Sequence, residues 1–314
     1  MYWPFFRSKQ EELLAIRELA SNSNSLISNI VVPIIKPHSS SSRVEGQLNK
    51  ILSTGLRFSL ILNTNEGSPI PPQNTVIQME ANLSSAHPNQ IFPALEVRAG
   101  VTSSEVASFI SRYQNRTILF VHRAHNLPAS IFTARSMIHV FDINHCSHNL
   151  ISQLQGHKVI LRDGFQKQAV NGNYPPSSRY LSDLYSYSQQ GFNGFGDFAS
   201  IGDVKAAKGG GAASHVALHL TEAVQNQHVE CRHFVSSINS TNNSIDQLYY
   251  NAVAKLVQHI GNPRHTFFKT QGVDDYCAHI NHYPGLGSVK RWSTKHHIEW
   301  IHRELRRQQA SAWI

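Results

Sequence analysis

Short, almost wholly apolar segments recur from residue 30 to residue 235. They are IVVPII at 30–35, FSLIL at 58–62, FPALEV at 92–97, TILFV at 117–121, MIHVF at 137–141, KVIL at 158–161, VALHL at 216–220 and VECRHFV at 229–235. Continuous apolar runs of this length are typical of strands that are buried on both faces. Helical patterns lie between several of them, as at 103–113 and 147–155. This alternation of strand and helix predicts parallel βαβ units.

Eight strands in a chain of 314 residues predict an α/β fold, an irregular (β/α)8 TIM-like barrel, with a doubly wound open sheet as the alternative. We expect a single barrel-like domain over 1–314. Its parts are an N-terminal helix within 1–24, barrel strands over 25–237 with a long loop near 164–214, and a C-terminal helical part over 238–314. Fewer than about 20 residues separate the last two strands, too few for a crossover helix, so that junction could be a hairpin.

The charge balance adds a ligand class to this picture. Lys and Arg number 28 against 20 Asp and Glu, a net charge of +8, which favours an anionic partner such as a nucleotide or nucleic acid. The 19 histidines supply metal ligands and proton-transfer groups. Three scattered cysteines form no disulfide framework, and neither a signal peptide nor a membrane span is recognisable. We therefore expect a cytoplasmic protein without a membrane partner.

Polar residues follow the predicted strands. In a barrel, the residues just past the C-terminal ends of the strands form the mouth, where function is found. This rule selects a set for substrate binding: Lys36, Asn63, Arg98, His122, Arg123 and Ser236.

Asp163, His219 and His233 are the strongest candidates for chemistry. Each lies in or against an apolar run, where an unpaired polar group is costly. A carboxylate with two imidazoles can bind a divalent metal or act as a general acid and base. The alternative is that both histidines are neutral core residues, satisfied by Asp163 or by backbone carbonyls.

A glycine-rich loop, GFNGFGDFASIGD at 191–203, carries two further carboxylates, Asp197 and Asp203. Its glycines allow it to fold back across the mouth, so Asp197 could join the catalytic set and Asp203 could contact substrate. The following Lys205–Gly211 (KAAKGGG) is interpreted as a lid or hinge. The G-x-S-x-G elbow, the G-x-G-x-x-G fingerprint and the P-loop are absent, which disfavours the common hydrolase, dehydrogenase and kinase families.

Several blocks together resemble the Beta protein family of largely uncharacterised bacterial and phage proteins. They are the opening Tyr2-x-Pro4-x-x-Arg7-x-Lys9-Gln10-x-Glu12-Leu13-Leu14, Asp163-Gly164-Phe165 with Asn173-Tyr174-Pro175, GFGDFASIGD, VALHL, HFVSS, and Pro284–Gly287 with His296-His297. The resemblance implies a barrel-like α/β fold. It also adds Arg7 and Lys9 to the candidate binding residues. One departure is Lys36, where many relatives carry an acidic residue.

The resemblance implies a genetic setting rather than a reaction. Members similar to this chain often lie beside a second small gene in phage-related regions. We therefore expect a barrel protein that works with a neighbour-encoded partner in phage defence or in a toxin and antidote system. The alternative is a metal-dependent phosphodiesterase or nucleotide hydrolase. In it, Asp163, Asp197, His219 and His233 would hold a divalent metal or exchange protons, and basic residues at the mouth would neutralise phosphate.

Overall fold

The structure is a computed structural model that describes residues 1–22, 27, 30–124, 127–133, 136–203, 214–224, 228–237, 243–262 and 268–311. The predicted lid Lys205–Gly211 lies outside these residues. The chain forms two compact units: Met1–Arg162 with Tyr185–Asp197, and Asp163–Leu184 with Phe198–Ile314. Among the described helices, none has the length and apolar character needed to cross a bilayer.

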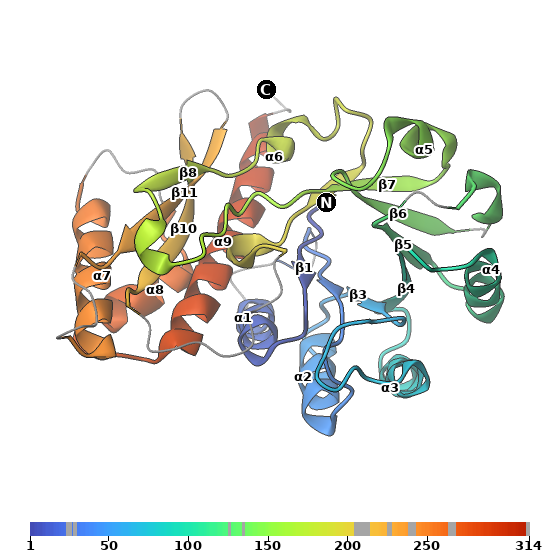
Figure 1. The fold of residues 1–314 in the computed structure, drawn as a ribbon, viewed down its shortest axis with the longest axis horizontal. Coiled ribbons are helices and arrows are strands. Elements are labelled where there is room, and N and C mark those ends of the chain that lie inside the picture. The colour runs from blue at the N-terminus through green and yellow to red at the C-terminus, as the bar shows by residue number, and fades with distance from the viewer. Residues whose placement is uncertain are drawn as a thin grey trace. The chain divides into compact units, whose positions relative to one another are not determined.

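The first unit contains the (β/α)8 barrel that the sequence predicts (Figure 1). Its parallel sheet has the order β1-β2-β3-β4-β5-β6-β7-β9. The strands are β1 (Phe5–Phe6), β2 (Ile34–Ile35), β3 (Phe58–Ile61), β4 (Ile91–Val97), β5 (Ile118–His122), β6 (Met137–Asp142), β7 (His157–Leu161) and β9 (Gly194–Gly196). The six apolar runs from IVVPII to KVIL supply β2 to β7, as predicted.

Helices follow most of the barrel strands. They are α1 (Gln10–Ser21), α2 (Ser42–Leu52), α3 (Gln73–Ala86), α4 (Ser103–Arg112) and α5 (His148–Gln153). Local chemistry sets where they begin: Thr102 accepts the backbone N–H of Glu105, and the Glu105 carboxylate accepts that of Thr102, a capping box that starts α4.

Glycines close the barrel. A parallel bridge joins Tyr2 to Phe195, and the backbone N–H of Trp3 donates to the Phe195 carbonyl at 2.8 Å. A Cβ atom on Gly196 would run into the backbone of Trp3, and one on Gly194 would lie 2.9 Å from the Met1 carbonyl oxygen. Only glycine therefore lets β9 approach this opening segment.

The second unit is built on a three-stranded antiparallel sheet of order β10-β11-β8. It comprises β8 (Ser177–Arg179), β10 (Ala217–Val224) and β11 (His228–Val235), with α7 (Ile245–Ile260), α8 (Gln271–Ala278) and α9 (Leu286–Ser311). The short α6 (Asp183–Ser186) lies where the chain returns to the barrel. One face of the sheet, with Leu218, Leu220 and Phe234, packs with α7, α8 and α9 in a common core.

The last two predicted barrel strands, VALHL and VECRHFV, therefore belong to this second sheet. They pair as a hairpin with Ala217 opposite Val235 and Val224 opposite His228. A connection this short cannot hold the crossover that a parallel pair needs, and the pairing is antiparallel for that reason. Their places in the barrel are taken by β1 and β9, which are too short to stand out in the sequence.

Candidate functional site

A buried ion-pair network occupies the C-terminal end of the barrel. Lys36, just after β2, is 2% exposed, and its Nζ donates to the two carboxylate oxygens of Glu96 at 3.0 and 2.8 Å. The same Nζ lies 3.1 Å from Glu66 Oε1, and Arg7 Nε lies 2.8 Å from Glu66 Oε2. Burial alone would raise the pKa of Glu66, but Arg7 and Lys36 hold it below its usual value.

Two arginines extend this network toward solvent. Arg98 lies 3.5 Å from Glu96, and Arg123 bridges Glu96 at 3.8 Å and Asp142 at 3.1 Å. Their side chains are 29% and 16% exposed, whereas Lys36 is almost fully enclosed. The named cations are Arg7, Lys36, Arg98 and Arg123, and the named carboxylates are Glu66, Glu96 and Asp142. These side chains carry one more positive charge than negative charges. Arg98 and Arg123 are the cations among them that are partly exposed to solvent.

Asn63 and Asp197 are engaged within the fold at this end of the barrel. Asn63 donates to the backbone carbonyl of Glu96 and accepts its backbone N–H, so it continues the β3–β4 ladder with its side chain. Asp197 is fully buried and accepts the hydroxyl of Tyr2 at 2.7 Å. Both residues position neighbouring groups in this structure.

His122 does not line the mouth, contrary to the prediction. It is fully buried and shares an outward-facing layer with Phe120, which packs on Phe109 of α4. Its Nε2 lies 2.9 Å from His139 Nδ1, and Phe141 stacks on its ring. Side chains along a strand alternate between faces, and the position of His122 assigns it to the helix side. The sequence shows where a strand ends but not on which face its last residue lies.

A cavity of about 490 Å³ opens beside the ends of β1 and β2. Its lining consists of Ser8, Gln10, Leu13, Leu14, His38, Ser39, Ser41, Arg43, Val44 and Gln47, from the two strand-to-helix turns and from α1 and α2. Ser8 has a left-handed backbone, with φ of 54°. Such strain in a non-glycine residue costs about 1–3 kcal/mol and concentrates at ligand sites.

Ser8 and His38 form a close pair in this cavity. Ser8 Oγ lies 2.9 Å from His38 Nδ1, and the backbone N–H of His38 donates to the same oxygen at 3.1 Å. Burial and the nearby Lys9 lower the pKa of His38, so the imidazole is neutral at neutral pH. Lys9 itself is the residue before α1, and its backbone N–H donates to Glu12. His38 follows the same strand end as Lys36, separated from it only by Pro37, so the strand-end rule selects it as well.

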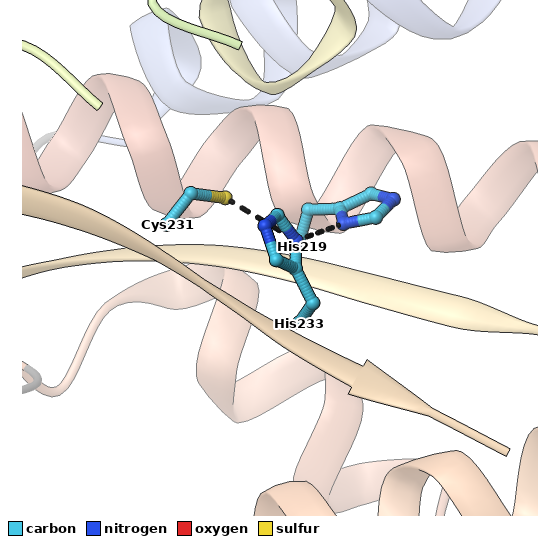
Figure 2. A group of neighbouring side chains, drawn as sticks. All are labelled: His219, Cys231 and His233. Atoms are coloured by element: carbon cyan, nitrogen blue, oxygen red, sulfur yellow. Dashed lines mark hydrogen bonds between the residues drawn. The ribbon is translucent and has the colours of Figure 1, made fainter. Parts of the chain in front are cut away.

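In the second unit, His219 and His233 lie opposite each other on β10 and β11. Their Nδ1 atoms are 2.8 Å apart, and Cys231 Sγ lies 3.9 Å from His233 Nδ1 (Figure 2). Burial lowers the pKa of His219 to about 3 and that of His233 to about 4, so both rings are neutral. Burial also raises the pKa of the Cys231 thiol. The structure thus brings the two predicted histidines together and adds a cysteine.

Asp163 accepts two backbone hydrogen bonds. Its Oδ1 accepts the backbone N–H of Phe165 at 2.9 Å, and its Oδ2 accepts that of Asp203 at 2.8 Å. Asp163 is thereby tied to the loop that carries Asp203. Ser236 accepts the backbone N–H of Val216 and continues the hairpin pairing. The predicted metal set of Asp163, His219 and His233 therefore becomes His219, Cys231 and His233. The spacing Cys-x-His within a strand, which places both side chains on one face, was the missed signal.

No protein-family model, no curated protein and no solved structure matches this chain. The resemblance to the Beta protein family therefore stays a prediction.

Proposed function

We propose that the barrel unit binds a phosphate-bearing ligand, a nucleotide or a phosphodiester, in the cavity at the ends of β1 and β2, and hydrolyses it. The observation that carries this proposal is the composition of the cavity: the first turns of α1 and α2, the Arg43 guanidinium and the Ser8–His38 pair. The N-terminus of α2, where Arg43 lies, presents positive potential to an anion. A volume of about 490 Å³ suits a small-molecule site.

His38 is the proton-transfer group in this proposal. A neutral imidazole can take a proton from an attacking water, and the hydrogen bond to Ser8 fixes the orientation of the ring. Arg43 and the helix N-termini stabilise the negative charge that develops on phosphate oxygens. Lys36, Arg98 and Arg123, which the sequence predicts as binding residues, contribute here through the positive potential of the neighbouring ion-pair network. This potential attracts the negatively charged substrate.

Calorimetric titration of the full chain with ADP and with pyrophosphate tests the binding step. Arg43→Ala removes an exposed cation from the first turn of α2 and should weaken binding about tenfold or more, since hydrogen bonds to charged groups contribute about 1.5–3 kcal/mol. Lys50→Ala removes an exposed cation from the last turn of the same helix and is the matched control. Equal affinity of both variants for the ligand, or no binding by the unaltered protein, contradicts the proposal.

Release of phosphate from a panel of nucleotides and phosphodiesters tests the hydrolysis step. His38→Gln should lose about 10²–10⁴-fold in rate, the usual contribution of general acid–base catalysis, while ligand affinity changes much less. A His38→Gln variant that retains the full rate would remove His38 from the mechanism.

The predicted partnership in phage defence and the neighbour-encoded protein are proposed on the family resemblance, and the cytoplasmic location on the three scattered cysteines. The experiment is affinity purification of the tagged protein from its native locus with the neighbouring genes intact. A stoichiometric partner protein that is lost when the neighbouring gene is deleted supports the proposal. Recovery of the protein alone, in amounts that would have revealed such a partner, contradicts it.

A further inference from the structure

We propose that His219, Cys231 and His233 in the second unit form a binding site for a zinc ion. Each residue offers one ligand atom, and all three of these atoms lie within 4.8 Å of one another. In this conformation the three side chains converge from two neighbouring strands, as Figure 2 shows. This site involves none of the residues of the barrel cavity and does not depend on the function proposed for it.

Two of the three ligand-atom distances are close to those of a tetrahedral zinc site, and the third, between Cys231 Sγ and the His219 nitrogen, is within 4.8 Å. Bonds of about 2.0–2.1 Å to nitrogen and about 2.3 Å to sulfur require ligand atoms about 3.3–3.6 Å apart. The two Nδ1 atoms, now 2.8 Å apart, would separate by about half an ångström on this geometry. Sγ and the Nδ1 of His233, now 3.9 Å apart, would approach by a few tenths of an ångström. Small side-chain rotations provide both changes, and the strand pairing already fixes the backbone.

The surroundings favour a metal over an isolated side-chain cluster. Ser178 Oγ lies 2.8 Å from His233 Nε2, the nitrogen that does not face the cluster. When Nε2 carries the ring hydrogen it donates to Ser178, and the lone pair of Nδ1 points to the metal position; outer partners of this kind orient metal-binding histidines. Tyr174 and Phe165 pack on the His219 ring and provide an apolar cover.

The ligand set selects the type of metal. Imidazole and thiolate ligands suit zinc, whereas magnesium and calcium prefer carboxylate and carbonyl oxygens. On binding, the Cys231 thiol loses its proton to solvent and both imidazoles stay neutral. Three protein ligands leave a fourth position for water or for a further group. Cys231 is fully buried, and His219 is partly buried.

The test begins with the full chain purified with zinc under reducing conditions, stripped with a chelator and reloaded with Zn²⁺ or Co²⁺. We expect about one ion per chain by elemental analysis, and a near-ultraviolet charge-transfer band in the Co²⁺ form that reports a cobalt–thiolate bond. Cys231→Ser should abolish this band. Cys277→Ser, which changes an exposed cysteine of the same unit, should leave it intact.

Ser178→Ala keeps all three ligands and should weaken zinc binding about 10–100-fold, as the loss of an orienting partner does. This variant keeps the proposal falsifiable if the ligand variants fail to fold. A folded, unaltered protein that takes up no zinc and shows no cobalt–thiolate band overturns the proposal. Uptake that Cys277→Ser abolishes and Cys231→Ser preserves overturns it as well. Copper bound in place of zinc, with no zinc taken up, also refutes the assignment.

Discussion

Acid should destabilise the barrel through the buried pair of His122 and His139. Both rings are fully buried, surrounded by Phe120, Phe132 and Phe141, and bonded to each other at 2.9 Å. Burial, with a further contribution from Lys158, lowers the pKa of His139 to about 4, and burial lowers that of His122 well below its usual value. In the unfolded chain the pKa of a histidine is about 6.5.

The unfolded state therefore binds more protons than the folded state between about pH 6.5 and pH 4. The stabilisation is complete above the unfolded pKa and is lost as the pH falls toward the folded pKa. For His139 alone, the linkage relation gives a loss of about 2 kcal/mol in the free energy of unfolding between pH 7 and pH 5. His122 acts in the same direction.

The double variant His122→Leu/His139→Leu removes both titrating groups. At pH 7 it should be close to the unaltered protein in stability, since replacing both partners of a buried hydrogen bond by apolar groups is nearly neutral. Urea titrations at pH 7 and pH 5 measure the effect, with pulsed hydrogen exchange of peptides from β5 and β6 to isolate the barrel unit. The unaltered protein should lose at least about 2 kcal/mol more than the double variant. Equal losses in the two proteins would refute the reasoning.

Four further substitutions test the fold of the barrel by urea unfolding and, for the last of them, also by amide exchange. Glu96→Gln should cost about 3 kcal/mol because it leaves the buried ammonium of Lys36 with a weaker set of partners, and an unchanged midpoint would show that the pair contributes nothing. Gly196→Ala should cost at least about 1–3 kcal/mol from its clash with the opening segment. Gly46→Ala, in α2 with open space around the added methyl group, should instead stabilise by about 0.5–1 kcal/mol; the same sign for both would contradict the packing argument. Thr102→Ala should cost about 1 kcal/mol by removing the N-cap of α4, seen as faster amide exchange in its first turn; unchanged exchange there would count against the cap.

The buried strands of the barrel were predictable from sequence. The seam of the barrel, where β9 meets the opening segment around Tyr2, was not. Strands such as β5 consist of consecutive apolar residues because helices and neighbouring strands enclose both faces. The closing strand β9 is Gly-Phe-Gly. Its glycines are required because any side chain in their place would clash with the opening segment at Met1 and Trp3. No local pattern contains that information. The short connection between β10 and β11 indicated a hairpin, but both strands were placed in the barrel because an apolar run does not show to which sheet it belongs.

The candidate sites divide in the same way. The shared position of Lys36, Arg98 and Arg123 around Glu96 was predictable because parallel strands present their ends at one edge of the barrel, whereas their predicted role in binding stays a prediction. His122 obeyed the same rule and still points to the helix layer. Cys231 was overlooked because cysteine ligands were sought in C-x-x-C pairs, whereas a strand brings residues two apart onto one face.

The seam of the barrel also affects the order of folding. Tyr2 meets Asp197 across 195 positions of the chain, and between β7 and β9 the chain leaves the barrel unit to supply residues 163–184 to the other. During synthesis the ring must stay open until almost two hundred residues have left the ribosome, with the edges of β1 and β7 unpaired throughout. Contacts this distant slow folding, because the loop they close must be ordered first. Until β9 is synthesised, the nascent protein therefore exposes an unpaired sheet edge that can pair with strands of other chains.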